Sequence, residues 1–288
     1  MATKNGRNFY AKKLHQINEN NNWNLNPEYR MQLTEYLRKR LETRKILLMT
    51  HAVVGYPSLE DNWAMLEAMG EADVDAVELQ MPFSEPTADG PLFVKANQEA
   101  LRNGTKLQDY FKLMQRASES FEFPVLMMGY CNTAFTMGFQ VFCENVRKHG
   151  GKGFIIPDLP FEECGQLFDH SLEFGLDPIM LCTPTNKEER LRKICSHGRG
   201  FIYCVARKGV TGESTVLEQS TENFLMQCRQ FTDLPLALGF GLSKPEELHM
   251  LQGKAEIAIV GTALLKTWEN DGKAAFQRHL NSLADARV

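Results

Sequence analysis

The sequence lacks the features of membrane proteins and of nucleic-acid binders. No apolar run in the chain approaches the roughly 20 residues that a membrane span needs. The formal net charge is −4, so there is no basic excess to hold a nucleic acid or an anionic membrane surface. What remains is a globular protein, and 43% hydrophobic with 24% charged residues fits one with a large core.

The cysteines lack the spacing of a metal or disulfide framework. The seven of them lie singly at positions 131, 143, 164, 182, 195, 204 and 228, and none forms a C-x-x-C pair. Neither a zinc site nor a set of disulfides is therefore indicated, and no metal is expected. Several lie in apolar segments, where Cys behaves as a small hydrophobic residue. This usage predicts a protein of the reducing cytoplasm.

The amino-terminal segment lacks the signs of a targeting sequence. It has neither the apolar core of a secretory signal nor the Ser- and Arg-rich character of a transit peptide. It is polar and rich in asparagine, with an Asn cluster at 20–22 that would break a short helix. We therefore expect residues 1–28 to be a polar extension of one domain over residues 29–288.

Short apolar segments alternate with segments of helical period along the rest of the chain. Strands are expected over 46–55, 76–80, 125–130, 153–158, 178–182, 201–206, 236–241 and 257–261. A helix is expected after each strand, and an extra one before the first, over 27–45. Near-continuous apolar strands suit a parallel sheet covered on both faces. Eight such units predict an α/β protein, a (β/α)8 TIM barrel with an extra N-terminal helix. No G-x-G-x-x-G follows the first strand, which argues against a dinucleotide-binding fold.

The stretch 76–91, AVELQMPFSEPTADGP, carries two acids near one strand end. Glu78 interrupts an apolar strand, where a buried carboxylate is unfavourable unless it is paired or has a task. Asp89 lies on the following loop and can fold back over the same strand end. Because the working groups of a barrel lie at the carboxyl ends of its strands, this pair suits acid–base catalysis. The structural alternative is a Glu78 satisfied by a neighbouring Lys or Arg and an Asp89 that starts a turn.

Three glycine-containing loops are expected at the same end of the barrel. They are GVTG (209–212), GFGLS (239–243) and GTA (261–263), after the sixth, seventh and eighth strands. Their backbone N–H groups, with the helix N-termini that follow, suit an anion, and barrels often bind phosphate there. Simple tight turns are the alternative. Arg207 and Lys208 could assist a phosphate or be solvated loop charges, and His51 in the first strand is given no chemical role.

Taken together, these motifs resemble those of the tryptophan synthase alpha chain family, the indole-3-glycerol-phosphate lyases. The resemblance runs in order over roughly residues 29–285. It rests on VELQMPFSEPTADGP (77–91), GYCN (129–132), PDLPFEE (157–163), GRGFIYCVARKGVTG (198–212), GFGLSKPEE (239–247) and AIVGTALLK (258–266).

The resemblance implies a retro-aldol cleavage of indole-3-glycerol phosphate to indole and glyceraldehyde 3-phosphate, without a metal or organic cofactor. Glu78 falls on the position of the proton shuttle, and Asp89 on that of the residue that accepts the indole N–H. Thr211 matches a mobile-loop threonine that orders over Asp89 during turnover. The phosphate loops contribute Gly212, Gly241, Gly261 and Thr262, and the residues around the substrate are Tyr130, Tyr203 and Phe240. The implied partner is a pyridoxal-phosphate-dependent beta subunit in an alpha2beta2 complex.

Several positions depart from the family pattern. Gln80 stands where Gly is usual, Glu85 where an aspartate helps to signal to the beta subunit, and His51 where an aromatic residue faces the indole. Val53 and Val94 replace a frequent threonine and the usual glutamine. Three interpretations therefore stay open: an alpha-chain-type lyase with a beta partner, a stand-alone diverged lyase of secondary metabolism acting on plain or substituted indole-glycerol phosphate, and a non-catalytic barrel that binds phosphorylated ligands.

Overall fold

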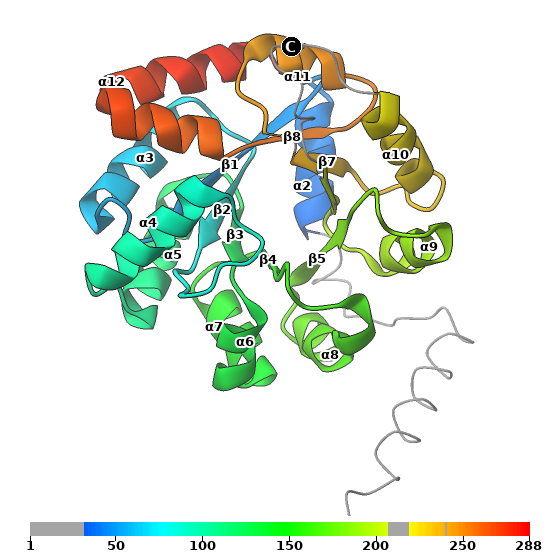
Figure 1. The fold of residues 1–288 in the computed structure, drawn as a ribbon, viewed down its shortest axis with the longest axis horizontal. Helices are drawn as coiled ribbons and strands as arrows, with labels where there is room; N and C mark the ends of the chain where they lie inside the picture. Colours follow the sequence, from blue (N-terminus) through cyan, green and yellow to red (C-terminus); the bar gives the residue numbers. More distant parts are fainter. Residues whose placement is uncertain (1–31, 207–218, 240) are drawn as a thin grey trace, which may run out of the picture. The chain divides into compact units, whose positions relative to one another are not determined.

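Eight parallel strands form a closed barrel in the computed structural model, which describes residues 32–206, 219–239 and 241–288 (Figure 1). Each strand pairs with the next in the chain, and β8 pairs with β1. The predicted barrel is confirmed, and β2 has the predicted bounds. The strands are β1 (Leu47–Val53), β2 (Ala76–Gln80), β3 (Val125–Met128), β4 (Gly153–Ile155), β5 (Asp177–Cys182), β6 (Ile202–Val205), β7 (Leu236–Gly239) and β8 (Ile257–Val260).

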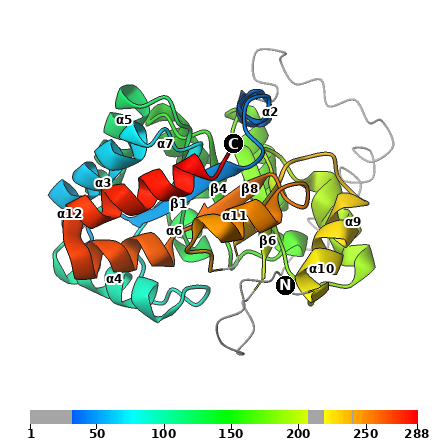
Figure 2. The same cartoon turned by 90° about the horizontal axis from the view of Figure 1, so that it is seen from above.

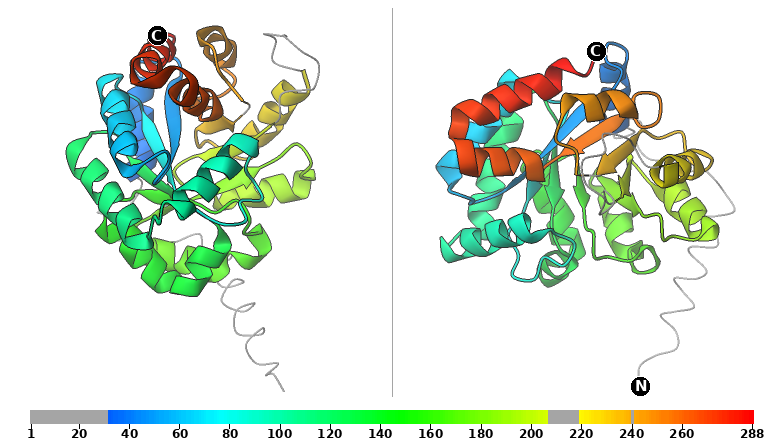
Figure 3. Two further views of the ribbon diagram at one scale, coloured as in Figure 1. Left: turned by 60° about the vertical axis from the view of Figure 1, so that its left-hand side comes forward. Right: turned by 45° about the horizontal axis from the view of Figure 1, so that its top comes forward.

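Helices surround the strands on the outside (Figure 3). They are α2 (Gln32–Leu41), α3 (Leu59–Glu71), α4 (Pro91–Arg102), α5 (Leu107–Ser120), α6 (Cys131–Met137), α7 (Phe139–Lys148), a 3-10 turn η2 (Phe161–Glu163), α8 (Gly165–Glu173), α9 (Glu188–His197), α10 (Gln219–Arg229), α11 (Pro245–Leu251) and α12 (Thr262–Asp285). None of the helices in the described ranges combines the length and apolar character that crossing a membrane requires.

Local signals explain several helix boundaries. Ser58 caps α3, as expected, with its side chain accepting a hydrogen bond from the Asp61 N–H at 3.0 Å. The predicted break at Asn103-Gly104 separates α4 from α5, and Pro245 begins α11. Two features were not predicted. The short helix α6 occupies the loop after β3, and α12 is kinked at Gly272, whose φ is +73°.

The alternation of β2 decides which of its side chains enter the barrel. Ala76 packs with the interior cluster that includes Leu47 and Leu126, whereas Val77 and Leu79 pack in the outer layer with the helices. Because successive strand residues point to opposite faces, Glu78 and Gln80 share the inner face with Ala76. The barrel is therefore apolar near the start of β2 and polar at its carboxyl end.

An ion-pair cluster closes the opposite end of the barrel. Asp75, just before β2, has a side chain that is 1% exposed and accepts from Arg40 at 2.7 Å, from Arg287 at 2.9 Å and from Arg44. The Leu48 N–H also donates to it, at 2.8 Å. Figure 2 shows the result, with α2 beside the carboxyl end of α12. This cluster stabilises the base of the barrel and lies away from the loops that follow the strands.

Candidate active site

Glu78 lies inside the barrel without a cationic partner among the residues that the structure describes. It is 2% exposed and sits between His51 of β1 and Leu126 of β3 in the strand register. Its Oε1 is 3.9 Å from His51 Nδ1, and its Oε2 has no hydrogen-bond partner. The alternative in which a Lys or Arg satisfies Glu78 is therefore not seen within the described ranges.

The surroundings of Glu78 favour its protonated form. Burial, reinforced by the charge of Asp89, raises the pKa of Glu78 to about 8. Burial lowers the pKa of His51 to about 4, so this imidazole is neutral near pH 7 and does not form a charged pair with Glu78. A carboxyl group that is protonated near neutral pH, yet close to its pKa, can give up and take back a proton.

Asp89 folds back over the end of β2, where two side-chain amides hold its carboxylate. Gln80 Nε2 donates to Asp89 Oδ2 at 2.6 Å, and Asn97 Nδ2 lies 3.3 Å from the same oxygen. Asn97 is itself fixed by the backbone, since it donates to the Phe93 carbonyl and accepts from the Phe83 N–H. Burial raises the pKa of Asp89, and the hydrogen bonds from Gln80, Tyr130 and Asn97 oppose that rise. Thus the two acids occupy unlike surroundings at one strand end.

Two tyrosines bound the same region. Tyr130, at the start of α6, is fully buried, accepts from the Ala88 N–H at 3.2 Å and stacks on Phe83. Burial raises the pKa of Tyr203 on β6, and the charges of Glu78 and Asp89 raise it further, as expected for a ring that faces both acids. Both tyrosines therefore border the region of the barrel that carries the two acids.

The glycine loops described by the structure lie at this end as well. Gly261 caps α12, and a Cβ built on it would lie 3.2 Å from His51 Cβ and 3.2 Å from Phe93 Cζ, so the backbone closely approaches α4 and β1, the strand that pairs with the Glu78-bearing β2. Gly241 has a φ of +75°, which favours glycine. Thr262 begins α12, whose first-turn N–H groups lack partners within the helix. Thr211, Gly212 and Phe240 lie outside the described residues.

A cavity of about 370 Å³ connects the Asp89 loop with the start of α12. Gly90, directly after Asp89, lines one side of it, and Thr262 lines the other. Lys266 and Glu269 of α12 contribute one positive and one negative charge to the same lining. The cavity therefore places the segment after one acid opposite the helix N-terminus that was predicted to bind an anion.

Part of this arrangement could not be predicted from the sequence. Gln80 departs from the family pattern, but the sequence does not pair it with Asp89. Nothing in the sequence marks Asn97, because its burial depends on how α4 packs over β2. His51, to which the sequence assigns no chemical role, stacks its ring on Phe93 at 4.4 Å between ring centroids.

The chain is similar to tryptophan synthase alpha chains in sequence and in fold. A sequence profile of the family described as tryptophan synthase alpha chain matches residues 37–286. Tryptophan synthase alpha chains of Desulforapulum autotrophicum and Syntrophotalea carbinolica are 44% and 41% identical, over 88% and 86% of this chain and 100% and 98% of their own lengths. Among solved structures, tryptophan synthase from M. tuberculosis in its aminoacrylate-bound form superposes with a TM-score of 0.81 at 26% identity, covering 90% of this chain and 100% of that one. A tryptophan synthase complex from Pyrococcus furiosus gives 0.77 at 26% identity, covering 84% and 98%.

Proposed function

This chain belongs to the tryptophan synthase alpha chain family, lyases that act on indole-3-glycerol phosphate, and we propose that Glu78 and Asp89 are its catalytic pair. One observation carries the assignment. Glu78 is a buried acid on the inner face of β2, with its pKa raised to about 8, beside an Asp89 held by amides. Such a pair supplies one group that can donate a proton and a second that can stabilise positive charge.

In the proposed reaction, Glu78 first donates its proton to C3 of the indole ring. The ring nitrogen becomes cationic, and the Asp89 carboxylate accepts its N–H and stabilises the charge. The Glu78 carboxylate then removes the proton from the hydroxyl group on the carbon attached to C3. The bond between that carbon and C3 breaks, its electron pair returns to the ring, and indole and glyceraldehyde 3-phosphate result. Glu78 ends protonated, ready for another turnover.

We further propose that the glycine loops bind the phosphate of the substrate. Gly261 and Thr262 offer the backbone N–H groups at the start of α12, and Gly241 and Gly212 offer those of the neighbouring loops. Tyr130, Tyr203 and Phe240 would surround the indole, with Thr211 ordering over Asp89. Anchoring the phosphate fixes the reacting carbon relative to Glu78, so the binding energy of a remote group contributes to positioning.

The remaining assignments follow from family membership and from the sequence. We propose a pyridoxal-phosphate-dependent beta subunit as partner, a role consistent with structural neighbours that are tryptophan synthases. We also propose a cytoplasmic location, and a catalytic domain over residues 29–288 with residues 1–28 as a polar extension.

A stand-alone lyase is the second candidate, and the bond between Gln80 and Asp89 favours it. Because a side chain of this chain already holds Asp89, part of the ordering of this loop comes from within the chain. An indole-release assay on indole-3-glycerol phosphate, with and without a beta subunit, separates the two. A large gain on adding the beta subunit supports the two-subunit enzyme, and equal rates support the stand-alone one. Binding of the substrate without indole release under either condition would support the non-catalytic barrel instead.

A further inference from the structure

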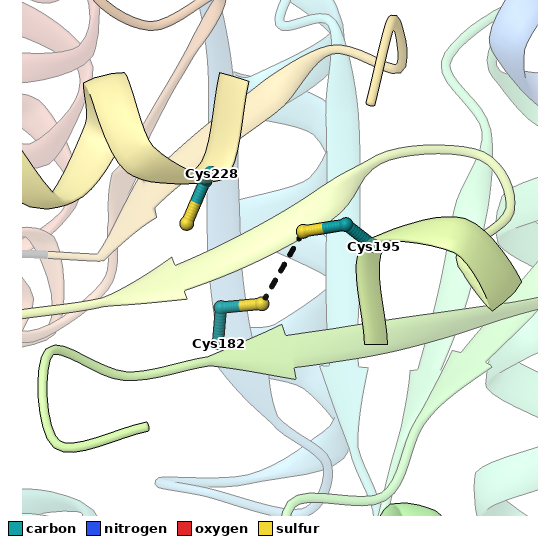
Figure 4. Close-up of side chains that lie close together, drawn as sticks. All are labelled: Cys182, Cys195 and Cys228. Carbon is teal, nitrogen blue, oxygen red and sulfur yellow. Dashed lines mark hydrogen bonds between the residues drawn. The ribbon is translucent and has the colours of Figure 1, made fainter. Parts of the chain in front are cut away.

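Three cysteines that lie far apart in the sequence bring their sulfur atoms together between the barrel and its outer helices. Cys182 ends β5, Cys195 lies in α9 and Cys228 lies in α10. Figure 4 shows the side chains of Cys182 and Cys195 directed toward one another, with that of Cys228 nearby. The Sγ atoms of Cys182 and Cys195 are 3.8 Å apart, and all three sulfurs lie within 4.8 Å of one another. We call this set the sulfur cluster.

We propose that the sulfur cluster binds a thiophilic divalent cation, Zn²⁺ or its softer analogue Cd²⁺. Zinc binds thiolates at about 2.3 Å in a tetrahedral arrangement, which separates neighbouring sulfurs by about 3.8 Å. The sulfurs of Cys182 and Cys195 already have this separation, and small side-chain rotations would bring Cys228 to it. A disulfide would instead require about 2.05 Å between two sulfurs, and all three residues are free thiols.

The composition of the sulfur cluster selects soft ions. Its ligand atoms are sulfur only, a set that favours zinc and related ions over magnesium or calcium. Cys204 of β6 is the strand-register partner of Cys182, but its sulfur does not belong to the group of three. The three residues of the sulfur cluster are at most 2% exposed, which shields such a site from competing water.

Charge balance is also suitable for a divalent ion. Three thiolates and one divalent ion leave a single negative charge, which is unfavourable in an apolar layer unless it is compensated. Arg229 follows Cys228 in α10, so a positive charge lies next to the sulfur cluster in the chain. Arg229 also pairs with Glu256, so its charge is shared between the two. Binding would release the thiol protons to solvent and join β5, α9 and α10 through one ion.

The test uses the full chain, stripped of metal by unfolding with a chelator under reductant and then refolded with Cd²⁺ or Zn²⁺, because a buried site is accessible only in the unfolded chain. We expect one ion per chain, an ultraviolet thiolate-to-cadmium charge-transfer band, and a melting temperature that rises with free ion concentration. Cys182→Ser and Cys228→Ser should lose the band and the bound ion.

Cys143→Ser is the matched control, since Cys143 is fully buried but lies outside the sulfur cluster, and it should retain both signals. If a serine variant fails to fold, Cys228→Ala removes the sulfur without placing a hydroxyl group in the apolar layer. Absence of bound ion after refolding would overturn the proposal, as would binding that Cys182 and Cys228 variants keep. Since the sulfur cluster is separate from Glu78 and Asp89, neither result depends on the proposed reaction.

Discussion

The amide nitrogen of Gln80 lies 2.6 Å from a carboxylate oxygen of Asp89, so the last residue of β2 holds the acid on the loop that follows it. Asn97 approaches the same oxygen from α4. These contacts fix Asp89 near Glu78, which occupies the inward-facing position of β2 next to that of Gln80. The loop geometry that the proposed reaction needs is thus built from residues of this chain, and it depends on the side chain of Gln80.

Replacing Gln80 by Gly should lower kcat/KM by about 10–100-fold, because a hydrogen bond to a charged group contributes about 1.5–3 kcal/mol. Loss of the amide removes one of the two side-chain donors to Asp89 and lets the loop move away from the site. Steady-state indole release measures the effect. The control uses alanine in both places, because glycine in the middle of α5 would itself disturb the helix. Gln80→Ala is therefore compared with Gln115→Ala. Equal kcat/KM for Gln80→Ala and the unchanged protein would show that Gln80 does not position Asp89.

The activity should fall as pH rises through about 8. Glu78 must be protonated to donate to C3, and burial with the charge of Asp89 raises its pKa to about 8. Deprotonation above that pH removes the donor, so kcat/KM loses about tenfold per further pH unit for a single group. The other titratable groups near Glu78 are His51, which is already neutral there, and Tyr110 and Tyr203, whose pKa values burial raises well above 10.0. A pH profile that stays flat through this range would contradict the role of Glu78 as donor.

His51→Phe should preserve or raise stability. The imidazole stacks on Phe93, which a phenyl ring can also do, and its Nε2 is buried without a hydrogen-bond partner. Removing such an atom relieves a desolvation penalty of about 1–3 kcal/mol. Urea unfolding at pH 7 measures the change. A marked loss of stability would contradict this account and would mean that the imidazole makes a stabilising polar contact.

Asp75→Asn should reduce the free energy of unfolding by about 3–5 kcal/mol, because it leaves buried arginines without their counter-ion. Arg287 is 5% exposed and depends on Asp75 for its ion pair. Asp73→Asn is the control, since Asp73 contacts Arg40 and Arg44 from an exposed position and Asn tolerates its φ of +51°. Chemical denaturation should show the larger loss for Asp75→Asn. Similar losses in both variants would argue that the cluster acts as a surface network.

The barrel could be predicted because its determinants are local. Eight apolar segments, each ended by a turn or followed by a helical pattern, determine eight strands, and the chain order then determines which strands pair. Glu78 was recognisable because an acid in a five-residue apolar strand conflicts with its surroundings. Asp89 was recognisable because it follows on the loop that this strand must enter.

The contacts that depend on packing could not be predicted. Asn97 reaches Asp89 only because α4 lies over the end of β2, and no sequence period encodes that contact. The sulfur cluster is a stronger example. Its cysteines lack any metal-binding spacing, and they meet only because β5, α9 and α10 pack as neighbouring elements of the barrel wall. Spacing rules detect sites whose residues lie within one segment, whereas the sulfur cluster takes its cysteines from three separate elements.

The most direct test of the central claim is indole release from indole-3-glycerol phosphate by Glu78→Gln, compared with the unchanged chain and with Glu119→Gln, an exposed acid on α5. Glutamine keeps the size of Glu78 but cannot exchange a proton. The rate with Glu78→Gln should fall by about 10²–10⁴-fold, the usual contribution of a placed acid or base, while Glu119→Gln keeps full activity. An unchanged rate in folded Glu78→Gln would contradict the assignment of Glu78 as the proton shuttle.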